Sequence, residues 1–115
     1  MKSKLTVIAS LVSISFTGLP ASGQSAEAIN RARMIGFLSK GECLLKTGSI
    51  TQETFEGVTN IYLKDNPELK PIYKWVTTST NGKAGVIAMA THYNSDCELN
   101  LSNAEAGEVI MPYVE

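Results

Sequence analysis

The feature that most restricts the fold of this chain is its cysteine content, because Cys43 and Cys97 are its only two cysteines. A single intrachain pairing is therefore possible, and disulfides persist in proteins that leave the cytosol. A bridge between them would enclose about 55 residues and, in the chain-entropy model, would stabilise the fold by ~4 kcal/mol. Their spacing is not C-x-x-C, and two cysteines with one histidine do not supply the four ligands of a tetrahedral metal site. We predict a structural disulfide and no metal.

Residues 1–23 have the organisation of a secretory signal peptide. Two lysines come first, an uncharged and mostly apolar run covers residues 5–16, and a proline and small residues precede the end of the segment. That run is about twelve residues long, shorter than the ~20 residues that cross a hydrocarbon core. We expect cleavage after Gly23, which leaves one domain over residues 24–115 in a secreted or periplasmic protein with no stable membrane span. Cleavage at the small-x-small site in residues 26–28 and an uncleaved anchor are the alternatives.

The segment from residue 25 to 46 has the pattern of a helix with two apolar sides. Ser25 is available as its N-cap, and Glu27 places a carboxylate at the positive end of the helix dipole. Small and apolar residues occupy two opposite faces at 100° per residue: Ala28, Ile29, Ala32, Ile35, Gly36, Ser39 and Cys43 on one, and Met34, Phe37, Leu38, Gly41, Leu44 and Leu45 on the other. A helix of this kind is buried between neighbours, so we expect it at the centre of a bundle, with a stop at Gly48.

Two shorter helices are predicted after the central one. Ser49 and Gln52 have the spacing of a capping box, with Thr51 as the competing cap, and the helical pattern continues to about Lys64. Its inward face comprises Phe55, Val58, Thr59, Tyr62 and Leu63. Because prolines interrupt the next stretch, residues 67–70 are expected to form a separate turn before a helix over residues 71–78.

The dipeptide Asn81-Gly82 allows two interpretations of the next segment. Asn-Gly between apolar runs is a strong hairpin signal, but it also suits the left-handed stop of a helix. Ala, Gly and Met are frequent in residues 84–90, and we therefore predict a helix over residues 83–94. Ala84, Ile87, Ala88 and Thr91 form a stripe at helical spacing along this segment, which favours the helix. Ser102 and Glu105 have a second capping-box spacing, which predicts a short terminal turn before Pro112.

These patterns predict an all-α fold, a small bundle of four helices plus a short terminal turn, closed by the Cys43–Cys97 disulfide. Cys97 would lie beside the end of the central helix and join it to the last predicted helix. The alternative is an α+β fold in which two helices pack on a hairpin around Asn81-Gly82.

Charge and motif content disfavour several classes of function. The chain has 10 basic and 11 acidic residues, and removal of residues 1–23 takes away two lysines and no acid, leaving a net charge of −3. Nucleic-acid binding is therefore not expected, since it requires a basic surface. The glycines match neither the dinucleotide-binding nor the phosphate-loop motif, so no cofactor is predicted. Asn100 begins a glycosylation triplet, which matters only in a eukaryotic secretory pathway.

Few residues are candidates for a functional site. His92 is the only histidine, and Asp96 would lie one helical turn further along if the helix continued, so the pair could orient an imidazole or bind a ligand. No nucleophile motif accompanies the pair, and no catalytic residue is assigned. Trp75 with Tyr73, Tyr93 and Tyr113 could form an exposed aromatic anchor for a protein partner. The alternative is that the aromatic rings fill the core, which we expect for Tyr73 as well as for Phe37, Phe55 and Tyr62.

The function that these observations predict is an exported, non-enzymatic module that binds a protein partner or protects proteins under stress. Its basis is an export signal on a disulfide-closed helical scaffold that lacks an assembled catalytic set. The alternative is a small extracytoplasmic ligand-binding protein or hydrolase that uses His92.

Overall fold

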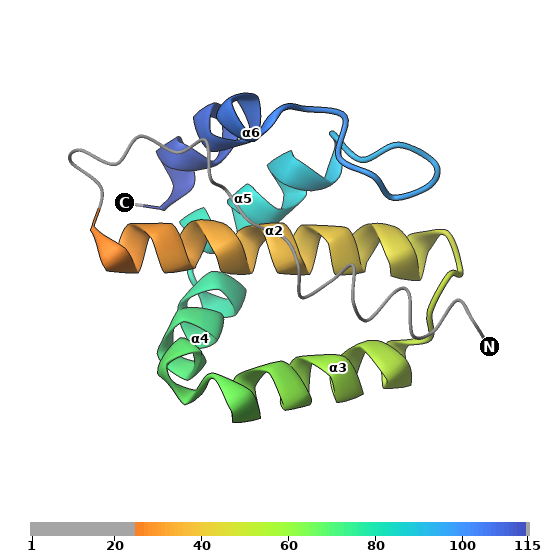
Figure 1. The fold of residues 1–115 in the computed structure, drawn as a ribbon, viewed down its shortest axis with the longest axis horizontal. Coiled ribbons are helices and arrows are strands. Elements are labelled where there is room, and N and C mark those ends of the chain that lie inside the picture. Colours follow the sequence, from red (N-terminus) through yellow and green to blue (C-terminus); the bar gives the residue numbers. More distant parts are fainter. Residues whose placement is uncertain (1–24, 115) are drawn as a thin grey trace.

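A computed structural model describes residues 25–114 of the chain, so the signal peptide predicted for residues 1–23 lies outside the described residues. Within residues 25–114 there are five α-helices, two short 3-10 helices and no strand (Figure 1). Cys43 and Cys97 are joined by a disulfide, with their Cα atoms 5.7 Å apart. The predicted all-α fold and the disulfide are therefore confirmed, and the hairpin alternative is wrong.

Helix α2, Ala26–Lys46, is the central element, as its two apolar faces predicted. The Ser25 hydroxyl accepts a 3.0 Å hydrogen bond from the Ala28 backbone N–H, which satisfies one of the free donors of the first turn. Gly48 follows the helix end with a φ of 75°, a conformation that glycine adopts without steric cost. Figure 1 shows α3 and α4 on one side of α2 and α5 and α6 on the other.

Helix α3, Gln52–Asp65, is capped by Thr51, whose hydroxyl accepts a 3.1 Å hydrogen bond from the Thr54 N–H. The capping box predicted for Ser49 and Gln52 is wrong, because the Ser49 hydroxyl lies 2.8 Å from the hydroxyl of Thr47 instead. Aromatic rings hold α3 against the central helix. The Phe37 ring lies with its centroid 5.7 Å from that of Phe55 and 4.8 Å from that of Tyr62.

The chain after α3 agrees closely with the prediction. A 3-10 helix, η1, covers Pro67–Leu69, and helix α4 covers Lys70–Thr78. The prolines stand in the first turn of each element, where the missing N–H has no intrahelical partner to lose.

Helix α5, Thr80–Ala90, is present but displaced from the predicted range of residues 83–94. Ser79 has extended backbone geometry, and its hydroxyl accepts a 2.9 Å hydrogen bond from the Gly82 N–H. Ser79 therefore ends α4 and caps α5, and Asn81-Gly82 lies in the first turn of the new helix. Neither the hairpin turn nor the left-handed stop predicted for Asn81-Gly82 is found.

The buried face of α5 is not the helical stripe noted in the sequence. Gly82, Gly85 and Met89 are buried, whereas Ile87, a member of that stripe, is 69% exposed. A Cβ atom added at Gly85 would lie 2.8 Å from the Ile35 side chain. The glycine face therefore lets α5 approach α2 more closely than any larger residue would permit, and this contact turns Ile87 outward.

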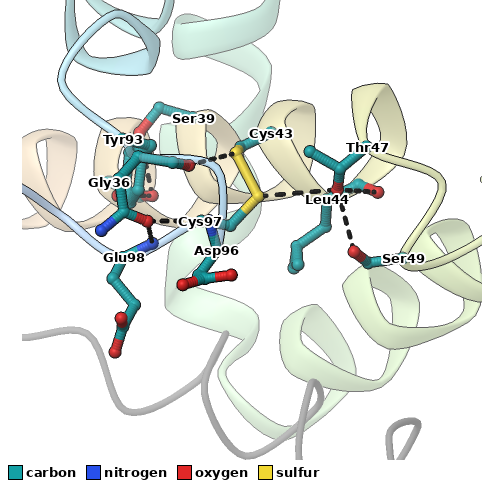
Figure 2. Close-up of a disulfide and its surroundings, with 11 residues drawn as sticks. Gly36, Ser39, Cys43, Leu44, Thr47, Ser49, Tyr93, Asp96, Cys97 and Glu98 are labelled. Atoms are coloured by element: carbon teal, nitrogen blue, oxygen red, sulfur yellow. Dashed lines mark hydrogen bonds between the residues drawn. A yellow bond between two sulfur atoms is a disulfide. The ribbon is translucent and has the colours of Figure 1, made fainter.

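The segment between α5 and α6 is tied to the central helix by the disulfide (Figure 2). The Asn94 side-chain oxygen accepts backbone hydrogen bonds from Asp96 at 2.9 Å and from Glu98 at 3.0 Å. Between these residues Cys97 adopts a φ of 57°, a left-handed conformation that is uncommon outside glycine. The local hydrogen bonds and the disulfide together hold this conformation.

Helix α6, Asn103–Ile110, begins with the predicted capping box. The Ser102 N–H donates a 2.9 Å hydrogen bond to the Glu105 carboxylate. Hydrogen bonding from the backbone and the side chain of Ser102 lowers the pKa of Glu105. The expected short turn is a two-turn helix, which gives five α-helices within residues 25–114 where four and a turn were predicted. A 3-10 helix, η2, Met111–Tyr113, ends the described chain, and Pro112 lies within it.

None of the helices in residues 25–114 combines the length and the apolar character that a membrane-spanning segment requires.

Candidate functional site

An open groove of about 1190 Å³ lies on the described part of the chain, bounded by α2, α5 and parts of α3 and α4. We call it the interhelical groove. The large apolar and aromatic side chains that line it are Leu38, Leu45, Phe55, Tyr73, Val76, Val86, Ile87 and Tyr93. An apolar hollow with a few polar groups at its edges is the usual form of a binding site.

The two long walls of the groove are helix faces. On α5 the lining residues Lys83, Val86, Ile87 and Ala90 stand at positions i, i+3, i+4 and i+7. On α2 the lining residues include Leu38, Glu42, Leu45 and Lys46. Residues at these spacings lie on one side of a helix, so each wall presents a continuous stripe of side chains to the groove.

One end of the groove is built on the disulfide. Cys43 lines it together with Tyr93 and Asn94 from the segment that Cys97 anchors. The Tyr93 hydroxyl lies 3.3 Å from the Gly36 carbonyl oxygen, to which it donates, and 3.5 Å from the hydroxyl of Ser39. Burial raises the pKa of Tyr93, and the Ser39 hydrogen bond opposes that effect. The phenol is therefore neutral near pH 7 and acts here as a hydrogen-bonding wall residue rather than a base.

A smaller cavity of about 320 Å³ adjoins α3. Phe55 and Tyr73 line both this cavity and the interhelical groove, and Glu56 adds a carboxylate to the smaller one. The rings of Phe55 and Tyr73 therefore stand between two hollows and present apolar surface to each.

Of the four aromatic residues considered as an anchor, Tyr73 and Tyr93 line the groove, and Trp75 and Tyr113 do not. Trp75 is half-buried elsewhere, with the guanidinium carbon of Arg31 3.9 Å from the centroid of its ring. The Arg31 guanidinium also donates a 2.9 Å hydrogen bond to the Val114 carbonyl and pairs with Glu27 at 2.8 Å. Trp75 is thus part of a cation–π cluster that fastens the end of the described chain to α2.

The structure does not support a helical pair of His92 and Asp96. Because α5 ends at Ala90, both residues lie in the following irregular segment, where His92 is half-buried and Asp96 is exposed. Within residues 25–114 no hydrogen bond or ion pair joins their side chains, and neither lines the interhelical groove. Residues 25–114 contain no group of three or more His, Cys, Asp and Glu side chains arranged to bind a metal.

The sequence interpretation missed Ile87 as a functional candidate, because it used that residue only as evidence for a helix. A signal for it was present: residues 84–90 are apolar all round the helix, which leaves one apolar face in excess if only one face is packed. Lys83, the only charged residue of α5, stands on that same face.

Comparison of this chain with protein-family models, with curated proteins and with solved structures finds no match.

Proposed function

We propose that this chain is an exported, non-enzymatic module that holds an apolar segment of a partner protein in the interhelical groove. The observation that carries the proposal is the position of Ile87, which is 69% exposed and stands in the wall of the groove. Each Å² of apolar surface left in water costs about 25 cal/mol, and a contiguous apolar patch with polar residues at its edge is typical of an interaction site. Ile87 shares the lining of the groove with the apolar side chains of Val86 and Leu45.

Export is supported by the signal-like organisation of residues 1–23 and by a disulfide within the described domain. Disulfides are rare in cytosolic proteins and frequent in small exported domains, because a small hydrophobic core contributes little stability to the fold. A partner in the periplasm or outside the cell is therefore the kind of protein that this module would meet. Protection of such a partner under stress is one form that this binding could take.

The alternative function, a ligand-binding protein or hydrolase that uses His92, has weaker support. His92 is outside the groove, and within residues 25–114 its side chain has no hydrogen-bonded carboxylate that would orient the imidazole. General base catalysis needs a positioned proton acceptor within hydrogen-bond reach of the reacting group. No observation on the described residues places such a group beside His92.

A matched pair of isoleucine variants tests the proposal. Ile87→Asp places a carboxylate in the groove wall, whereas Ile61→Asp makes the same change at a residue of α3 that is 62% exposed and does not line the groove. Because both side chains are mostly in water, neither change should lower the free energy of unfolding by more than about 0.5 kcal/mol. We expect Ile87→Asp to abolish co-purification of the partner from the extracytoplasmic fraction and Ile61→Asp to retain it.

The readout is quantitative mass spectrometry of proteins recovered with each tagged variant, alongside thermal denaturation curves that confirm an intact fold. Equal recovery of every protein by the wild type and both variants would refute the proposal that the groove is the binding site.

A further inference from the structure

The α5 wall of the interhelical groove has lining residues at the spacing by which one helix packs against another: Lys83, Val86, Ile87 and Ala90. One face of α5, with Gly82, Gly85 and Met89, is packed in the core, and the face with Val86 and Ile87 points to the groove. A helix that is apolar on two sides is stable in water when both sides are covered. On the described residues only one side is covered, so the groove occupies the place of a missing neighbour in the bundle.

The dimensions of the groove agree with an α-helix as the occupant. Its α2 wall extends from Leu38 to Thr47 and its α5 wall from Lys83 to Ala90, which at 1.5 Å per residue correspond to about 14 and 10 Å. A volume of about 1190 Å³ distributed over such a length gives a width close to the ~10 Å of a helix with its side chains. A helix of two to three turns, with apolar residues at i, i+3, i+4 and i+7, would fill it.

The backbone chemistry of the walls also favours a helical occupant over an extended peptide. Within residues 25–114 there is no strand, and the walls are helices whose interior N–H and C=O groups bond to one another. An extended segment in this apolar groove would leave its own backbone donors and acceptors without partners, at a cost of roughly 1–3 kcal/mol for each buried group. A helix satisfies those groups internally and presents only side chains.

The charges of the groove indicate which flanking residues the occupant carries. Three charged residues line it: Lys83 on α5, and Glu42 and Lys46 one turn apart on α2. Lys83 is the only charged residue of its helix, whereas Glu42 offsets the charge of Lys46 locally. At 0.15 M salt the Debye length is about 8 Å, so these local charges govern recognition more than the acidic net charge of the protein.

From these observations we infer that the occupant is an amphipathic α-helix of the partner whose apolar stripe is flanked by acidic side chains, with Lys83 as the main determinant of that preference. The inference deepens the proposed function and rests on it. The apolar stripe supplies the buried area, and the acidic flank selects the orientation and the partner, since rim charges contribute mainly to specificity and association rate.

Three synthetic helices test the inference directly. The first has leucines at i, i+3, i+4 and i+7 with flanking glutamates, the second has lysines in place of those glutamates, and the third has the composition of the first with its leucines spread around the circumference. Each has about 14 residues and carries a side-chain lactam, because free helices of that length are marginal in water. We expect the acidic amphipathic helix to bind about tenfold more tightly than the basic one by fluorescence anisotropy, and the spread version not to bind measurably.

A charge-reversal pair identifies the residue responsible. Lys83→Glu should remove the preference or invert it, and Lys74→Glu, at an exposed α4 residue that does not line the groove, should leave the tenfold ratio unchanged. Both substitutions lie on the surface, and an unchanged melting temperature shows that each variant is folded.

Equal affinity of the acidic and basic helices, equal affinity of the spread helix, or an unchanged ratio in Lys83→Glu would overturn the inference. So would displacement of the acidic helix by sodium laurate at lower concentration than by unlabelled helix, since an acyl chain would then be the better occupant. The Ile87→Asp and Ile61→Asp variants test the proposed function independently. If Ile87→Asp alone loses the partner while any of the peptide results above is obtained, the groove is still the binding site, and only the inference of an acidic helical occupant is refuted.

Discussion

Reduction of the Cys43–Cys97 disulfide is expected to lower the melting temperature of the domain by roughly 15–30 °C. The bond closes a loop over a sequence separation of 54 residues, more than half of the described chain. In the chain-entropy model such a loop restricts the unfolded ensemble enough to stabilise the fold by ~4 kcal/mol. Small domains have total stabilities of about 5–15 kcal/mol, so this single bond is a large part of the whole.

The folded structure adds a local reason for a large effect. The segment that contains Cys97 has one isolated β-bridge, between Tyr93 and Leu99, and is attached to α2 by the disulfide and by the hydrogen bonds of the Tyr93 hydroxyl with Gly36 and Ser39. Cys97 also holds a left-handed backbone conformation with a φ of 57°. Loss of the bond therefore releases both the long loop and the end wall of the groove.

The measurement is thermal denaturation followed by circular dichroism, with and without a phosphine reductant, on the wild type and on a Cys43→Ala/Cys97→Ala variant. The reduced wild type and the variant should melt at similar temperatures, and the variant should not respond to reductant. A wild-type melting temperature that is the same in both redox states would show that the bond contributes little to the stability.

Gly82→Ala is expected to destabilise the domain by about 2 kcal/mol or more, although alanine is the better helix former. A Cβ atom at this position would lie 2.5 Å from the Val76 Cα and 2.6 Å from the Val76 carbonyl oxygen. Both are backbone atoms of α4, so the clash is relieved only if the two helices move apart. Such a movement would disturb the tight junction at Ser79, whose hydroxyl caps α5 through Gly82.

Gly57→Ala is the matched control, because Gly57 lies inside α3 and nothing stands within 4 Å of the Cβ atom it would gain. This change should stabilise the domain by about 0.5–1 kcal/mol through backbone entropy alone. Urea denaturation of the two variants measures the contrast. If Gly82→Ala were as stable as Gly57→Ala, the close contact between α4 and α5 at Gly82 would be refuted.

The parts of the fold that were predictable are those that local signals determine. The Ser25 cap, the Gly48 stop and the Ser102–Glu105 capping box each depend on residues within one turn of each other, and all three are present. The disulfide was predictable for a different reason, since two cysteines allow only one pairing.

The parts that were not predictable depend on contacts between helices. Asn81-Gly82 is a strong turn signal on its own, but the Ser79 hydroxyl bonds to the Gly82 N–H and draws the dipeptide into α5. The outward direction of Ile87 accompanies the close packing of Gly82 and Gly85 against other elements. The local pattern indicates only that α5 has one apolar face in excess, and not which face is packed.

The candidate site was predictable only in part, for the same reason. Tyr73 was a candidate because aromatic residues are frequent in interfaces, although a core position was also expected for it; it is half-buried and lines the groove. Trp75 met the same criterion, yet it lies beneath Arg31, a residue 44 positions away in the sequence. The proposed pair of His92 and Asp96 required a helix that continues through both residues, but α5 ends at Ala90.

The most direct test of the central claim, that the interhelical groove is where a partner is held, is site-specific photo-crosslinking. A photoreactive phenylalanine analogue at position 87 is compared with the same analogue at position 61 in cells, and adducts are recovered from the extracytoplasmic fraction. We expect a discrete adduct at position 87 whose crosslinked peptide comes from an apolar segment of one partner protein, and none at position 61. Absence of an adduct at position 87, or the same adducts at both positions, would contradict the claim.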